Sequence, residues 1–322
     1  MRAIRVNAFG GPEVLAIETV AEPEPGANQV LVDVRVAGVA YGDVIVRSGL
    51  FPVPLPWIPG GEVGGVVAGV GPGVDESLLG RTVVSTTAGY AGGYAQCAVS
   101  EVDGTFVVPD GLDLEVALTV FGAGALARGL LSALRLQPED TVLVTAAAGR
   151  VGSLLVQLAK WAGAGVIGAA GAGKLAAVRE FGADHAVDYG GADWPVRVRE
   201  LTGGRGASVV LDAVGGQVGE GAIAAAADGA GRVGLYGYAC GVWPTVDLPT
   251  VLRRGLVLCG PLGMVAQKPD ADRRADAGYV LAAAARGELR SRIHARYPLE
   301  RVQEAHRELA GRRSVGAIVL TM

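Results

Sequence analysis

Short runs of apolar and β-branched residues fill the first 110 positions of the chain. They include QVLVDVRVAGV, EVGGVVAGV, RTVVSTTA and TFVVP, with Gly, Pro and Asp turns between them, and such runs predict short strands. The segment FPVPLPWIPG (51–60) fits neither a helix nor a central strand, because proline fixes φ and lacks an N–H donor. We therefore predict that residues 1–110 are all-β, with an extended loop at 51–60.

The pattern changes near residue 113. DLEVALTVFGAGALARGLLSALRL has helical periodicity, and strand-like runs then alternate with helix-period segments. The strand-like runs are TVLVTA, GVIGAAG, HAVDY, ASVVLDAVGG, RVGLYGY and GLVLCGPLG. Several of them are continuously apolar, which is typical of parallel strands covered on both faces. The alternation predicts an α/β domain with a doubly wound parallel sheet.

The end of the chain differs again. Two helical segments, DRRADAGYVLAAAARGEL and RVQEAHRELAG, precede a strand-like run, SVGAIVLTM. A lone terminal strand needs a sheet partner, and the N-terminal β region can supply one. We therefore expect a nucleotide-binding domain at 121–264, inserted into a discontinuous β-rich domain made of 1–120 and 265–322.

Composition narrows the possible functions. The net charge of the 322 residues is -4 and no Lys/Arg block occurs, which argues against a nucleic-acid surface. Gly, Pro or charged residues interrupt the apolar stretches before about 18 residues, so no membrane span is expected. The first residues show no apolar h-region and no cleavage signature, so no secretory signal is expected, and Cys97, Cys240 and Cys259 lie far apart. These features favour a cytoplasmic protein.

The stretch TAAAGRVGSLLVQLAKWAG (145–163) contains a small-residue turn between a strand and a helix. A dinucleotide-binding turn needs a tight bend, a bare backbone near the pyrophosphate and close helix–strand packing. Ala147, Gly149 and Gly152 occupy these three positions, and alanine fits the first if its φ is negative. The helix N-terminus would then face the phosphates. The alternative is a structural bend without a ligand.

The end of the next strand bears on the choice between NAD and NADP. An NAD site usually has Asp or Glu about 20 residues after the glycine turn. This chain has Gly168, Ala169, Ala170 and Gly171 there, so no carboxylate would repel a 2′-phosphate. Lys174 follows and is the expected phosphate contact. The sequence thus favours NADPH, although Lys174 could also be a solvated lysine that starts a helix.

Several motifs carry a resemblance that covers essentially the whole chain. They are AAGRVG, LDAVGG, AGVAYGDVIVRSGLF and PGGEVGGVVAGVGPGV. The chain resembles the zinc-independent quinone oxidoreductase branch of the medium-chain dehydrogenase/reductase family. The resemblance implies a GroES-like β-rich catalytic domain, a Rossmann domain and NADPH in the cleft between them. It also implies a homodimer joined edge to edge through the Rossmann sheets.

The same resemblance implies a set of cofactor contacts. Gly149, Arg150, Val151 and Gly152 would lie at the pyrophosphate. Lys174 and Tyr189 would lie at the 2′-phosphate. Gly237 and Tyr238 fall where the family's strand-end loop passes the nicotinamide. The side chain of Arg150 could contact a phosphate or face solvent.

The residues argue against a catalytic zinc. Zinc-dependent relatives carry Cys near the position of Ala40 and a His-Glu pair where this chain has Gly61 and Glu62. A zinc site needs three or four ligands at one point. The three histidines are expected on strand or helix surfaces: His185, His294 and His306. We expect no metal.

The catalytic groups are the main departure from the family. The family usually offers an Asn at the position of Ala40 and tyrosines at or near Ile45 and Phe51, and all three are apolar here. Tyr41 is then the nearest candidate proton donor. Asp43 matches an Asp that borders the nicotinamide cleft. Tyr41 could also be a packing residue, and Asp43 could be a turn-stabilising acceptor.

Together these features predict an NADPH-dependent, metal-free reductase of a quinone or an α,β-unsaturated carbonyl. The apolar loop FPVPLPW and the missing tyrosines favour a small hydrophobic substrate. One alternative is an enoyl reductase or reductive cyclase acting on a polyketide-type thioester or natural-product intermediate. Another class is a non-catalytic NADPH-binding sensor or regulatory protein.

Overall fold

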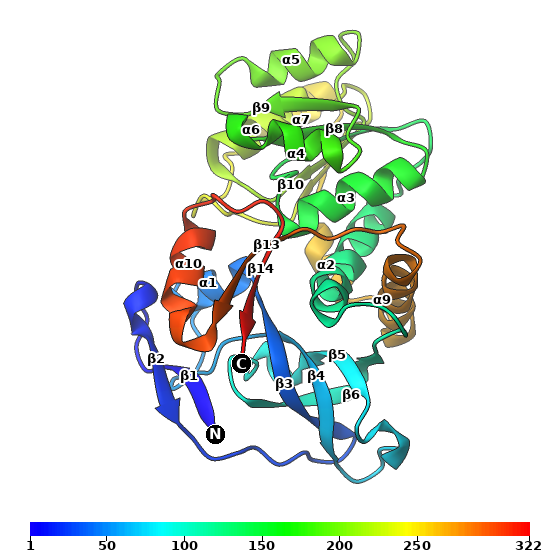
Figure 1. Cartoon of the computed structure of the whole chain (residues 1–322). Helices are drawn as coiled ribbons and strands as arrows, with labels where there is room; N and C mark the ends of the chain where they lie inside the picture. The colour runs from blue at the N-terminus through cyan, green and yellow to red at the C-terminus, as the bar shows by residue number, and fades with distance from the viewer. The chain divides into compact units, whose positions relative to one another are not determined.

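The computed structural model describes residues 1–322 (Figure 1). The chain divides into two compact units, one made of 1–122 with 277–322 and the other of 123–276. The boundaries fall inside two helices, α2 (Leu114–Ala133) and α9 (Asp270–Ala285). The sequence placed the second boundary after residue 264. The structure places it later because the following segment stays with the second unit, where Val265 packs against Gly129.

The first unit is built on β strands. Its strands are β1 (Arg2–Val6), β2 (Leu15–Thr19), β3 (Gln29–Val39), β4 (Glu62–Val70), β5 (Thr82–Thr87), β6 (Cys97–Val107), β13 (Ile293–Pro298) and β14 (Ala317–Thr321). β1 and β2 form a separate pair, and the other six form one sheet in the order β13-β14-β3-β4-β5-β6. β6 also pairs with β3, so these strands close on themselves. This is the expected GroES-like architecture.

The last strand finds the partner that the sequence predicted. β14 pairs antiparallel with β3, with Ile318 opposite Val39 and Thr321 opposite Val36. β13 pairs parallel with β14 on its other side. Helix α10 (Val302–Ala310) packs against both strands. The C-terminal residues therefore belong to the fold of the N-terminal region.

The prediction that 1–110 is all-β is wrong where the chain forms helical segments. Residues Tyr41–Arg47 form a short helix, α1, although YGDVIVR is rich in β-branched residues. The carboxylate of Asp43, at the third helical position, accepts a hydrogen bond from the Ala40 N–H at 3.0 Å. This local cap outweighs strand propensity. Three 3-10 turns, Pro12–Val14, Glu76–Leu78 and Ala88–Tyr90, also interrupt the region.

The second unit confirms the predicted doubly wound sheet. Its strands are β7 (Thr141–Val144), β8 (Gly165–Ala170), β9 (His185–Asp188), β10 (Val209–Asp212), β11 (Arg232–Leu235) and β12 (Val257–Cys259). They are all parallel, in the order β12-β11-β10-β7-β8-β9. The helices between them are α3 (Arg150–Trp161), α4 (Leu175–Glu180), α5 (Trp194–Leu201), α6 (Gly216–Ala225) and α7 (Leu248–Arg254), and α8 (Pro261–Ala266) follows β12. The strand order reverses between β7 and β10, and ligands bind at such a switch point in doubly wound sheets.

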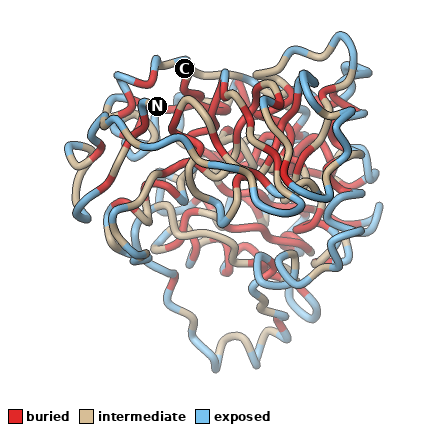
Figure 2. The backbone as a smooth tube through the Cα atoms, turned by 90° about the horizontal axis from the view of Figure 1, so that it is seen from below, coloured by how far each residue is buried: buried red, intermediate tan, exposed pale blue.

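Most positions of the central strands in both sheets are buried. Figure 2 shows the buried residues as red runs of the tube. Helix α2 alone is long and apolar enough to cross a membrane, which differs from the expectation that no such segment occurs. More than half of the most apolar stretch of this helix is buried inside the protein. A core helix has this same composition, so the helix is weak evidence for a membrane span.

Candidate functional site

The glycine turn lies between β7 and α3, at the switch point of the parallel sheet. Ala147 is buried, and its N–H donates to the Ala169 carbonyl of the neighbouring strand β8 at 3.1 Å. The residue with a positive φ is Ala146, at 47°, rather than Ala147. Ala147 therefore meets the condition under which alanine can replace the first glycine of the motif.

The two glycines of the turn have different roles. A Cβ at Gly152 would lie 2.2 Å from the Ala146 carbonyl oxygen and 2.9 Å from the Ala147 Cα, so only glycine lets α3 pack this closely against the turn. Gly149 is the N-cap of α3, and no side chain caps this helix. The backbone at the helix N-terminus is therefore accessible to an anion, and the helix dipole favours negative charge there. This geometry fits a pyrophosphate cradle.

The end of β8 fits a nucleotide phosphate. After Ala170 the chain makes a 3-10 turn at Ala172–Lys174, and a Cβ at Gly171 or Gly173 would meet only open space. Lys174 is half-buried at the end of this turn. Tyr189 follows β9, and its N–H donates to the Ala170 carbonyl at 3.2 Å. The predicted phosphate residues Lys174 and Tyr189 thus both lie at the carboxyl end of β8.

The carboxyl ends of β10 and β11 carry two loops that bond to each other. The N–H groups of Ala239 and Cys240 donate to the carbonyls of Ala213 and Val214, at 3.0 and 2.9 Å. A Cβ at Gly237 would lie 2.9 Å from the Ala213 carbonyl oxygen, so the loops approach closely there. Gly237 and the adjacent Tyr238 therefore lie on the same edge of the sheet as the cradle.

Asp212 holds this edge together. It is fully buried at the end of β10. Its carboxylate accepts hydrogen bonds from the Thr145 hydroxyl at 2.6 Å and from the Gly215 N–H at 2.9 Å. Burial raises the pKa of this carboxyl, and the hydrogen bonds oppose the rise. The carboxylate also accepts from the Val214 N–H at 3.2 Å, so Asp212 fixes the ends of the strands to the loop that follows β10.

The remaining candidates, Tyr41 and Asp43, belong to the first unit. Tyr41 is the first residue of α1 and is half-buried. Asp43 is buried and accepts hydrogen bonds from three different segments. Ala40 and Phe51 are exposed. These are two exposed apolar residues at positions where the resemblance led us to look for polar side chains.

One histidine contradicts the expectation of a surface position. His306 is completely buried in α10, because this helix packs its apolar face against β13 and β14. No group of three or more His, Cys, Asp or Glu side chains is placed to hold a metal ion. The residues present do not fit a zinc site, which needs at least three such ligands.

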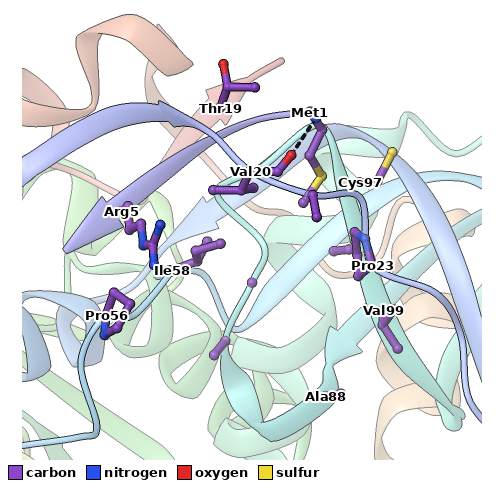
Figure 3. A pocket seen from close by; sticks show the side chains of 14 residues that line it. Met1, Arg5, Thr19, Val20, Pro23, Pro56, Ile58, Ala88, Cys97 and Val99 are labelled. Atoms are coloured by element: carbon purple, nitrogen blue, oxygen red, sulfur yellow. Dashed lines mark hydrogen bonds between the residues drawn. The ribbon is translucent and has the colours of Figure 1, made fainter. Parts of the chain in front are cut away.

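Both units contain cavities, and two of these cavities bear on the location of the site. One, of about 660 Å³, is formed in the first unit by residues that include Arg5, Val20, Ile58, Ala88, Cys97 and Val99 (Figure 3). It contains none of the predicted site residues. The other, of about 400 Å³, lies at the carboxyl ends of β11 and β12 and is lined by Leu235, Trp243, Leu258, Cys259 and Gly260. Its mostly apolar walls suit a flat hydrophobic group.

Comparisons with known proteins place the chain in a family. The alcohol dehydrogenase GroES-like domain matches residues 26–127, and the zinc-binding dehydrogenase domain matches residues 151–273. The quinone oxidoreductase of Pseudomonas aeruginosa is 35% identical, over 99% of each chain. A 2-haloacrylate reductase of a Burkholderia species is 31% identical, over 98% of this chain and 97% of its own.

Solved structures agree with this match. A mycobacterial protein complexed with NADPH superimposes with a TM-score of 0.93 at 34% identity, and all of both chains is covered. The quinone oxidoreductase of Escherichia coli complexed with NADPH gives a TM-score of 0.93 at 28% identity, again over both whole chains. The chain therefore belongs to the quinone oxidoreductase branch of the medium-chain dehydrogenase/reductase family.

Proposed function

We propose that this protein is an NADPH-dependent reductase of quinones or α,β-unsaturated carbonyl compounds. The observation that carries the proposal is the cradle between β7 and α3, at the switch point of a parallel sheet, beside a strand end that has a lysine and no carboxylate. Relatives with the same fold were solved with NADPH. The protein is an oxidoreductase, and NADPH is its cofactor.

The residues present fit this cofactor. The backbone of Gly149, Arg150, Val151 and Gly152 would hold the pyrophosphate. Lys174 and Tyr189 would contact the 2′-phosphate, and Gly237 and Tyr238 would lie beside the nicotinamide. The fit rests on the close packing of α3 against the turn at Gly152, where a Cβ would clash with the Ala146 backbone, and on the open surface beside Gly171 and Gly173.

The cofactor supplies a hydride, and the protein must bind and orient the acceptor. In an enone the hydride adds to the β-carbon, and the resulting enolate takes a proton. In a quinone the hydride and a proton together give the hydroquinone. Tyr41 is our candidate for the proton donor, and Asp43 supports the helix that carries Tyr41. No step needs a metal.

The choice of substrate rests on two observations. Two relatives are named quinone oxidoreductase and 2-haloacrylate reductase, and a quinone and a 2-haloacrylate both contain an electron-poor carbon–carbon double bond. In this chain Ala40 and Phe51 are apolar and exposed, and Trp243 lines an apolar cavity at the strand ends. These features favour a hydrophobic acceptor without many hydrogen-bonding groups.

Steady-state assays with 1,4-naphthoquinone and with a small cyclic enone test the proposal. We expect NADPH oxidation to depend on the acceptor and on enzyme concentration. Turnover of enoyl thioesters without turnover of quinones would favour the enoyl reductase or cyclase alternative. Tight NADPH binding with no turnover of any acceptor would favour a sensor.

We also propose that the protein is a cytoplasmic homodimer joined through the edge of its parallel sheet. β12 is an edge strand, and Val257 on it is exposed. Leu248 and Leu252 project from α7, one turn apart, and Leu252 is 81% exposed. Apolar side chains at an open sheet edge are typical of an interface.

Leu252→Glu is expected to give a monomer, because a charge at the centre of an apolar interface would be desolvated without a partner. Light scattering after size exclusion measures the mass. Leu79→Glu is the matched control, since Leu79 is an exposed leucine of the first unit. A wild-type monomer, or equal masses for both variants, would contradict this interface.

A further inference from the structure

Three buried polar side chains from distant parts of the sequence form a chain of hydrogen bonds in the first unit. The Tyr94 hydroxyl donates to the Asp43 carboxylate at 3.1 Å and lies 3.3 Å from Nε2 of His306. Tyr94 and His306 are both completely buried, and their rings meet edge to face at 5.8 Å. Buried polar groups are costly unless they are bonded, and these bonds offset that cost and fix the three side chains relative to one another.

The hydrogen bonds have a defined direction. Because Tyr94 donates its proton to Asp43, its oxygen can only accept from His306, and this assigns the His306 proton to Nε2. Nδ1 of His306 has no hydrogen-bond partner, and a bare lone pair is the less costly atom to leave there. Burial and the nearby Arg47 guanidinium lower the pKa of His306 to about 3, so the ring is neutral.

At its other end, this row of hydrogen bonds reaches the first turn of α1 through Asp43. Asp43 accepts from the Ala40 N–H at 3.0 Å and from the Gly60 N–H at 3.2 Å. Gly60 has a φ of 99°, and a Cβ there would lie 2.5 Å from Cδ1 of Tyr94. Tyr94 therefore packs directly on the end of the loop 51–60. Helix α10, which carries His306, lies beside α1 (Figure 1).

We infer that Asp43, Tyr94 and His306 are positioning residues, which hold the first turn of α1 and the end of the loop 51–60 in the arrangement needed for reduction. This inference rests on the proposed function, because Tyr41 and Phe51 lie on the two segments that are held. The three residues act through these segments and need not touch the substrate.

The arrangement predicts a pH dependence. Tyr94 and Glu62 on β4 act directly on Asp43, and His306 on α10 is bonded to Tyr94. Arg47 on α1 acts on His306, and Glu13 acts on Arg47. Burial raises the pKa of Asp43 to about 6, while Tyr94 and the backbone N–H groups oppose the rise. Ionised Asp43 accepts all three bonds, so kcat/KM should increase as the pH rises through about 6.

The same ionisation of Asp43 should change the stability of the folded protein in the opposite direction to kcat/KM. The folded protein binds the Asp43 proton more tightly than the unfolded chain, whose pKa is near 3.8. The stabilisation from this proton is complete below that value, and it is lost as the pH rises through about 6. Activity and stability should therefore change in opposite directions between these two values.

Tyr94→Phe removes the hydroxyl and keeps the ring. We expect kcat/KM for the quinone to fall about tenfold with an unchanged Kd for NADPH. The acid limb of the pH profile should shift to higher pH, because Asp43 loses a donor that stabilises its charge. Tyr90→Phe is the matched control, since Tyr90 is 74% exposed in the same region. A lower Tm for Tyr94→Phe with unchanged kinetics and pH profile would overturn the inference.

Two variants of His306 and an exchange measurement separate this inference from the proposed function. His306→Gln keeps an N–H donor and should retain most activity, whereas His306→Leu should match Tyr94→Phe. Equal activity of the two variants would count against a role for the hydrogen bond between His306 and Tyr94. Hydrogen exchange of residues 40–47 should accelerate in Tyr94→Phe, and this needs no substrate. Wild-type turnover tests the function by itself, and unchanged exchange would reject the positioning role whatever that turnover is.

Discussion

Gly152→Ala is expected to abolish tight binding of NADPH. The new Cβ would lie 2.2 Å from the Ala146 carbonyl oxygen, and the other close atoms are also backbone, so no flexible side chain can move away. Helix α3 must therefore shift from the turn, and such overpacking costs roughly 1–3 kcal/mol of folding free energy. Because the helix N-terminus is itself the proposed phosphate site, we expect the Kd for NADPH to rise at least about tenfold.

Gly278→Ala is the control for this variant. Gly278 also lies in a helix, α9, but a Cβ there meets nothing within 4 Å. Alanine should stabilise that helix by roughly 0.5–1 kcal/mol, because glycine loses more backbone entropy on folding. Fluorescence titration with NADPH and chemical denaturation measure both variants. Wild-type affinity in Gly152→Ala would show that α3 can move without cost and would remove the cradle from the proposed site.

Lys174→Ala is expected to change the preference between the two nicotinamide cofactors. A hydrogen bond to a charged group contributes about 1.5–3 kcal/mol, so the Kd for NADPH should rise roughly 10- to 100-fold. The Kd for NADH should change less than about twofold, because NADH lacks the 2′-phosphate. The end of β8 also has no carboxylate that could bind the ribose 2′-hydroxyl of NADH.

Lys160→Ala serves as the matched control, since the Lys160 ammonium bonds to Asp184 at 2.7 Å. It should leave both affinities unchanged. Titrations with each cofactor at two salt concentrations give the comparison, and the difference for Lys174→Ala should shrink at high salt. An equal loss of NADH and NADPH affinity would contradict the assignment of Lys174 to the 2′-phosphate.

The cofactor half of the site could be predicted because its signals are local. The strand, turn and helix around Gly149 and Gly152 follow one another in sequence, and so do β8, Gly171 and Lys174. In a parallel sheet the carboxyl ends of all strands meet at one edge. Local order therefore places these residues at one edge without any knowledge of distant contacts. Their contacts with NADPH remain predictions.

The part of the site in the first unit, around α1, could not be predicted in the same way. Short helix α1 has a strand-like composition, and only the bonds of Asp43 to Ala40, Gly60 and Tyr94 show why it forms. His306 sits in an amphipathic helix whose pattern does not show how deeply a single polar residue is buried. The second boundary between the units also depended on a distant contact, between Val265 and Gly129.

The sequence by itself determined the two-part architecture, the family and the preference for NADPH, because strand period, glycine spacing and a missing carboxylate are properties of neighbouring residues. Tertiary structure decided which polar groups are buried together. Asp43, Tyr94 and His306 are separated by long stretches of chain, and they meet only because β14 returns to β3 and carries α10 against α1. Burial then sets the protonation of each group, which no local pattern encodes.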